Sequence, residues 1–147
     1  MELPLSVSAA HTGELTLGVA GPGALGCDLE AVAARPASVW RDLLGVDGIR
    51  LAREVMRETG EGLDAAATRV WAGRECLDKA GAAGAPLVVG RSDEDGWVVL
   101  ASTGLSIPTC VVRLRGGGSA AVAVATSRAG APLPSIIPEM ASHGAAR

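Results

Sequence analysis

The order of hydrophobic patterns along the chain is the feature that most restricts its fold. Alternating or continuous apolar residues, typical of strands, occur at 14–30 and again between 86 and 125, whereas 36–80 has the spacing of helices. A β-hairpin, a helical block and a further set of strands in this order indicate an α+β protein. We therefore expect an antiparallel sheet packed with about three helices.

Turn-forming residues divide the first strand region. The motif GPG, residues 21–23, separates ELTLGVA (14–20) from ALGCDLE (24–30). Glycine and proline between two such segments are a strong turn signal. The two segments are therefore predicted to pair as a β-hairpin.

Helix boundaries are marked by proline and glycine. Pro36 suits the first position of a short helix that ends at Gly45, and a second short helix is expected to end at Gly60. A longer helix is predicted over 63–80, where apolar residues form a stripe that Gly81 closes. Strands are expected beyond it, in the segments 86–90, 96–100, 105–114 and 119–125.

The C-terminal segment differs in composition from the rest of the chain. Several prolines stand there among small residues, a composition that disfavours a packed core. We expect residues 1–128 to form one domain and 129–147 to form a disordered tail. A length of 147 residues fits a single domain.

Composition excludes several classes of protein. The chain has no Tyr or Phe and three Trp residues, so its core must consist mainly of Val, Leu and Ala. No apolar run approaches the roughly 18 residues of a transmembrane helix, and the N-terminus lacks the pattern of a secretory signal. A cytoplasmic protein with no membrane partner is expected. A net charge of −3 and an isoelectric point near 5.3 provide no basic surface for nucleic acid.

The three cysteines give no sign of a metal or disulfide framework. Cys27, Cys76 and Cys110 are widely separated, no CxxC motif is present, and the chain has only two histidines. Neither a zinc site nor a set of disulfides is therefore supported. We expect the cysteines to be buried small apolar residues.

Charged residues gather in two segments of this otherwise apolar chain. On a strand, Asp28 and Glu30 point to the same side, opposite Cys27 and Leu29. On the helix 63–80, Glu75 and Lys79 share a face, with Trp71 one turn before Glu75. If that face meets the strand, three carboxylates and an ammonium group converge. Such carboxylates suit Mg²⁺, which completes its shell with water and substrate phosphates.

Each of these features has an ordinary explanation when taken alone. Asp28 and Glu30 would suit the solvent-facing edge of a sheet, and Glu75 with Lys79 would suit a surface ion pair of about 0.3–0.5 kcal/mol. His11 would suit a turn. Arg74 and Asp78 would form a common helix pair. The combination and its order carry more weight than any single part.

Three segments together resemble the 4′-phosphopantetheinyl transferases. The segment SAAHTG precedes a strand, GCDLE matches the G-(I/V)-D-(I/L)-E motif of that family, and WAGRECLDKA follows about forty residues later. The last segment is similar to the helix motif (W/F)-(S/T)-x-K-E-(S/A)-x-x-K, matching it at Trp71, Glu75, Lys79 and, in kind, Arg74. The likeness spans about Ser6 to Ala125 and implies a single half-unit of the phosphopantetheinyl transferase fold.

The resemblance implies a role for each matching residue. Asp28, Glu30 and Glu75 correspond to the Mg²⁺ ligands, and Glu75 also to the group that deprotonates the incoming serine. Lys79 corresponds to the cation at the leaving phosphate, whereas His11 and Arg74 are expected to contact phosphates of coenzyme A. The implied reaction transfers 4′-phosphopantetheine from coenzyme A to a serine of an acyl carrier protein. It releases 3′,5′-ADP.

The sequence departs from the family pattern at Ala10, Ala72 and Arg74, which stand where Ser, a hydroxyl residue and Lys are usual. The motif order resembles the two-halved surfactin type, while the length resembles the small trimeric type. Carboxy-terminal transferase domains of iterative polyketide synthases, notably enediyne synthases, are similar in both order and composition. A trimer, another homo-oligomer or a domain of a larger synthase is therefore expected. Two further hypotheses are a non-catalytic homologue that binds coenzyme A or a carrier protein, and an unrelated α+β module with solvated acids.

Overall fold

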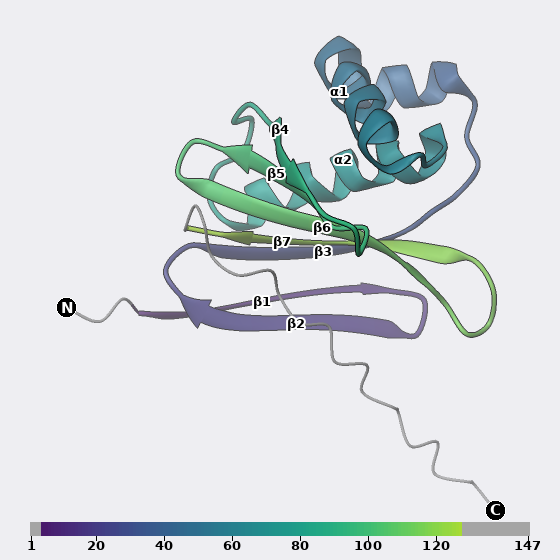
Figure 1. The fold of residues 1–147 in the computed structure, drawn as a ribbon. Coiled ribbons are helices and arrows are strands. Elements are labelled where there is room, and N and C mark those ends of the chain that lie inside the picture. The colour runs from purple at the N-terminus through teal and green to yellow at the C-terminus, as the bar shows by residue number, and fades with distance from the viewer. Residues whose placement is uncertain (1–3, 128–147) are drawn as a thin grey trace, which may run out of the picture.

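The computed structural model describes residues 4–127 and consists of a sheet with helices on one face and a strand hairpin beneath one side of the other (Figure 1). The elements in this range are β1 (Leu5–Thr12), β2 (Leu15–Pro22), β3 (Leu25–Ala31), α1 (Ala37–Thr59), α2 (Leu63–Lys79), β4 (Val88–Ser92), β5 (Val98–Ser102), β6 (Leu105–Arg113) and β7 (Ser119–Thr126). The predicted α+β class is confirmed. The tail predicted at 129–147 lies outside the described residues.

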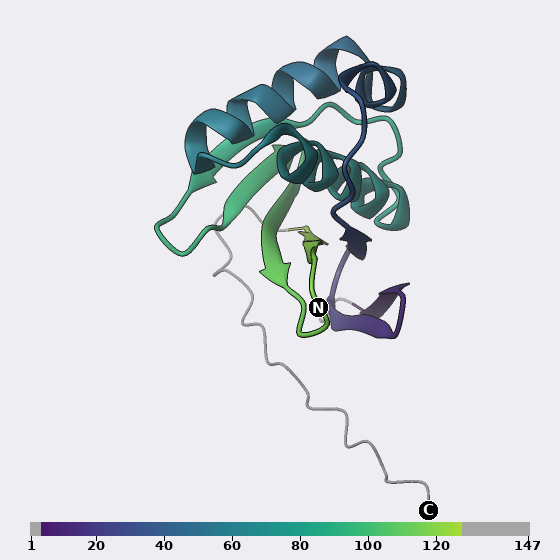
Figure 2. The ribbon, with the colours of Figure 1, turned by 90° about the vertical axis from the view of Figure 1, so that its right-hand side faces the viewer.

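Two antiparallel sheets make up the β structure. Five strands pair in the order β3-β7-β6-β5-β4, and β1 pairs with β2 as a separate two-stranded hairpin. The helices lie on one face of the larger sheet and the hairpin lies on the other, beneath β3 (Figure 2). Strand β3 is therefore enclosed between α2 and the hairpin.

The predicted hairpin between 14–20 and 24–30 is wrong. Strand β2 pairs with β1, where Thr12 lies opposite Leu15 and two residues form the turn, and Gly13 has a positive φ of 56°. A two-residue loop with such a glycine is the favoured hairpin connection. At the GPG motif the chain instead passes from one sheet to the other, and β3 pairs with β7.

The helices follow the predicted boundaries closely. Helix α1 is broken at Gly45, whose φ of 70° and ψ of −178° are not helical, so it consists of the two expected pieces. Gly60 ends the second piece in the left-handed conformation, with its N–H donating to the carbonyl of Met56. Helix α2 spans Leu63–Lys79, within one residue of the prediction.

The main core lies between the helices and the sheet. Its buried side chains are aliphatic apart from Trp40 and Cys76, which confirms the core composition expected from the sequence. The indole N–H of Trp40 donates to the carboxylate of Asp64 at 2.7 Å and ties the start of α1 to the start of α2. A second, smaller cluster fills the space between β3, β7 and the hairpin.

The charged side chain of Arg69 is buried in this core. Arg69 of α2 is 1 % exposed, forms an ion pair with Glu61, and donates to the carbonyl oxygens of Thr109 at 2.8 Å and Gly96 at 2.9 Å. It therefore joins α2 to β6 and to the turn before β5. No pattern in the sequence distinguishes Arg69 from the exposed arginines.

All three cysteines are buried and unpaired, as predicted. Burial raises the pKa of the Cys110 thiol to about 11, and the pKa values of Cys27 and Cys76 are raised for the same main reason. These thiols are therefore protonated near neutral pH. Within residues 4–127, neither helix has the length and apolar character required to cross a membrane.

Candidate functional site

Strand β3 presents its two acids toward α2. Asp28 is 6 % exposed, and its neighbours Cys27 and Leu29 belong to the cluster on the hairpin side of the strand. The alternation predicted from the sequence is therefore present. Strand β3 is unusual because its buried face carries carboxylates, which are rarely buried in proteins.

Lys79 connects the last turn of α2 to these strands. Its Nζ lies 3.6 Å from Oδ1 of Asp28 and donates to the carbonyl oxygen of Cys27 at 2.9 Å. A third contact, at 3.3 Å, reaches the carbonyl oxygen of Ala9 in β1. A single ammonium group thus holds α2, β3 and β1 together beside the buried Asp28.

The pKa of Glu30 is affected by the same cluster of acids. Partial burial raises the pKa of its carboxyl to about 7, with further contributions from the charge and hydrogen bonding of Asp28 and from the charge of Glu75. Hydrogen bonding to the indole of Trp71 acts in the opposite direction. The face of α2 that carries Trp71 and Glu75 therefore meets the face of β3 that carries the acids.

The oxygen atoms of this cluster suit a hard divalent cation. Oδ2 of Asp28 is buried and has no hydrogen-bond partner, which is costly for a carboxylate unless a cation or ordered water satisfies it. Within residues 4–127, no three His, Cys, Asp or Glu side chains are arranged closely enough to hold a metal ion. Asp28 and Glu30 are therefore the residues that fit a cation best, because Mg²⁺ commonly takes one or two carboxylates and keeps several waters.

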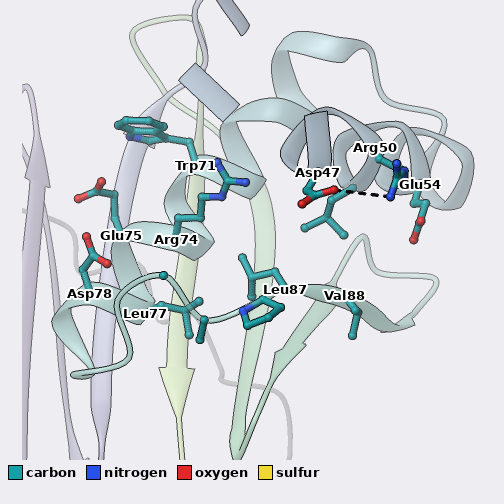
Figure 3. Close-up of a pocket in the computed structure, with 14 residues that line it drawn as sticks. Asp47, Arg50, Glu54, Trp71, Arg74, Glu75, Leu77, Asp78, Leu87 and Val88 are labelled. Carbon is teal, nitrogen blue, oxygen red and sulfur yellow. Dashed lines mark ion pairs between the residues drawn. The ribbon is translucent and has the colours of Figure 1, made fainter. Parts of the chain in front are cut away.

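A groove of about 690 Å³ lies beside the cluster, between α2, the second piece of α1 and the segment 84–88 (Figure 3). Trp71, Glu75 and Asp78 line the end nearest to β3, and Leu51, Leu77 and Leu87 contribute apolar surface. The groove gives a ligand access to Glu75 from the helical side of the molecule.

Arg74 also lines the groove but points away from Glu75, toward α1 (Figure 3). Its Nη1 donates to the carbonyl oxygen of Leu44 at 2.7 Å, an oxygen that precedes the break at Gly45. Gly48 leaves room for the guanidinium, because a Cβ there would lie 2.7 Å from Nη2. The structure does not bring Arg74 to the acids, and its contact with a phosphate stays a prediction.

His11 lies near the end of β1, opposite Thr16, with an exposed side chain. Within the described part of the chain, no hydrogen bond or ion pair joins it to Asp28, Glu30 or Glu75. Its phosphate contact therefore also stays a prediction. The adjacent Ala10 is 7 % exposed and packs in the cluster between the hairpin and the sheet.

The backbone acceptors of this site have no signal in the sequence. The carbonyl oxygens of Ala9 and Cys27 hold Lys79, and backbone acceptors cannot be recognised from residue types. The contact between Trp71 and Glu30 was foreseeable in part, because Trp71 lies one turn before Glu75.

Neither a protein-family model nor a curated protein sequence matches the chain.

Proposed function

We propose that this protein transfers 4′-phosphopantetheine from coenzyme A to a serine of an acyl carrier protein in a Mg²⁺-dependent reaction. The observation that carries the proposal is the meeting of β3 and α2. It groups Asp28, Glu30, Glu75 and Lys79, which are the residues that the sequence motifs single out. A grouping of solvated surface acids would not bury Asp28 or leave its Oδ2 without a partner.

The proposed roles follow from the chemistry of each side chain. Asp28 and Glu30 would hold Mg²⁺, and Glu75, the third ligand that the motif implies, would have to approach them when the ion binds. The bound ion would neutralise charge on the diphosphate of coenzyme A. The serine oxygen attacks the β-phosphorus, and the bond from that phosphorus to the bridging oxygen breaks. Glu75 accepts the serine proton, directly or through water, and Lys79 donates a proton to the departing 3′,5′-ADP. Positioning and charge neutralisation would supply most of the rate enhancement.

The proposed partner is a carrier protein or carrier domain, and the proposed setting is a cytoplasmic polyketide synthase. Leu5 and Val7 of β1 are each 75 % exposed on the outer face of the hairpin. The two side chains lie on the same face of β1, and contiguous exposed apolar surface favours association. We propose that a second copy of the chain, or another part of a larger synthase, covers this face.

A non-catalytic homologue that binds coenzyme A or a carrier protein is the second candidate. It is favoured by the engagement of Arg74 with the carbonyl oxygen of Leu44, since a guanidinium held there does not face the acids. In this alternative the chain would bind coenzyme A but leave the carrier serine unmodified.

The test is intact-mass analysis of an apo carrier protein incubated with the chain, coenzyme A and Mg²⁺. Addition of one phosphopantetheine group is expected with the wild type and not with Glu75→Gln or Asp28→Asn. Asp42→Asn, which changes an exposed acid of α1, is the matched control and should remain active. Binding of coenzyme A by calorimetry without any mass gain would instead favour the non-catalytic homologue.

A further inference from the structure

Gly26 lies directly beneath the last turn of α2. A Cβ built at this position would lie well inside the 3.0 Å that real Cβ atoms keep from the carbonyl oxygen of Cys76. It would also lie 3.1 Å from the amide nitrogen of Ala80 and 3.1 Å from Cβ of Lys79. These atoms belong to the backbone or to the root of a side chain, so none of them can rotate away.

The absence of a side chain therefore sets how closely α2 approaches β3. Gly26 precedes Asp28 by two residues, and Lys79 starts from the turn that rests on Gly26. From there its ammonium group reaches Cys27 and Asp28. Glu75 lies one turn earlier on the same face. The contact between Gly26 and the end of α2 thus places both Glu75 and Lys79 against the acids of β3.

The other strand glycines are less constrained. At Gly90 in β4, an added Cβ would lie 3.2 Å from the carbonyl oxygen of Val99, outside the 3.0 Å limit. At Gly18 and Gly21 in β2, an added Cβ would have no heavy atom within 4 Å. Gly73 of α2 would meet Cδ1 of Leu100 at 3.0 Å, but this is the end of a flexible side chain that can move. Gly26 differs because only a shift of the whole helix end would relieve the crowding.

We propose that Gly26 is a positioning residue that fixes the separation of α2 and β3 at which Glu75 and Lys79 act on the groups held by Asp28 and Glu30. A methyl group at position 26 must move the end of α2 outward by several tenths of an ångström. A displacement of about 1 Å can lower an enzymatic rate by about 100-fold. The catalytic part of this inference rests on the proposed function, whereas its geometric part does not.

The test compares Gly26→Ala with Gly18→Ala in the full chain. If the chain has the proposed activity, kcat for phosphopantetheine transfer should fall roughly 10- to 100-fold in Gly26→Ala, while Gly18→Ala keeps the wild-type kcat. Far-UV circular dichroism and the melting temperature verify that both variants are folded. An unchanged kcat in a folded, active Gly26→Ala variant would overturn the proposal.

A second readout does not depend on activity. Lys79 is the only lysine of the chain, so acetylation by an amine-reactive ester, followed by peptide mass spectrometry, reports on it alone, with the N-terminal amine as internal reference. Loss of the contacts with Cys27 and Asp28 should raise the acetylation rate several-fold in Gly26→Ala and leave it unchanged in Gly18→Ala.

The two readouts separate the two ideas. If the wild type modifies no carrier protein but Lys79 becomes more reactive only in Gly26→Ala, the positioning by Gly26 holds and the proposed function fails. If the reactivity of Lys79 stays at the wild-type rate, the positioning inference fails whatever the activity. A Gly26→Ala chain that does not fold also contradicts it, because Gly26 would then be required for the fold itself.

Discussion

Replacement of Arg69 by Met should destabilise the protein by about 3–5 kcal/mol, the range for breaking a buried ion pair. Arg69 is 1 % exposed, and the Glu61 side chain that pairs with it is 21 % exposed. Met roughly preserves the length of the side chain. It leaves the Glu61 carboxylate uncompensated and removes a donor from the carbonyl oxygens of Thr109 and Gly96. The Thr109 acceptor is buried, and leaving it without this donor costs about 1–3 kcal/mol, whereas Gly96 is exposed and water can replace the guanidinium there.

Urea unfolding followed by circular dichroism measures the loss in free energy of unfolding, and thermal unfolding measures the corresponding decrease in melting temperature. For a domain of this size, 1 kcal/mol corresponds to roughly 3 °C in melting temperature, so a decrease of about 9–15 °C is expected. Arg57→Met, which changes an exposed arginine in the last turn of α1, is the matched control and should cost less than about 0.5 kcal/mol.

The double variant Arg69→Met/Glu61→Gln tests the physical reason for the loss. If the uncompensated carboxylate causes part of the destabilisation, the second change should cost less than it does in the wild type, or should recover some stability. A loss below about 1 kcal/mol in Arg69→Met alone would refute the reasoning, because it would mean that the guanidinium contributes little beyond the volume that Met replaces.

Three further predictions concern the site and the surface. In EDTA, the free energy of unfolding measured in urea should fall as the pH rises from about 4.5 to about 7, because the folded state keeps a proton on Glu30 that the unfolded chain releases; Glu30→Gln should remove that part of the slope. Replacing Leu5 and Val7 by Thr should lower the apparent mass in light scattering if their exposed face associates with a second copy, and an unchanged monomeric mass in the wild type would exclude that association. Arg74→Met should cost about 1–2 kcal/mol through loss of the bond to Leu44, and an unchanged KM for coenzyme A would remove Arg74 from the predicted phosphate contacts.

The elements of the fold were largely predictable, but their pairing was not. Local signals such as Gly45 and Gly60 act within a few residues, so they marked the helix boundaries well. The choice between pairing β2 with β1 and pairing it with β3 depends on competition between two turns and on which strand completes the larger sheet. Strand β3 pairs with β7, which lies far along the chain, and no local pattern specifies such a partner.

The sequence predicted which side chains of the site share a face of a strand or of a helix, because each type of element has a fixed period. The two-residue period placed Asp28 and Glu30 together, and the helical period placed Glu75 with Lys79. That these two faces meet depends on tertiary packing, in particular on the close approach at Gly26. The positions of Arg74 and His11 were less predictable, because a long side chain can reach several partners and an exposed one is not fixed by packing.

The pairing of β3 with β7 has a consequence for synthesis of the protein on the ribosome. Asp28 lies opposite Ala123 in this ladder. Strand β3, which carries Asp28 and Glu30, can therefore pair with β7 only after the last described strand has been synthesised. Contacts between such distant segments form slowly, because a long loop must close first. A nascent chain therefore holds both helices long before it holds an assembled site, and any activity is expected to begin only with the completed sheet.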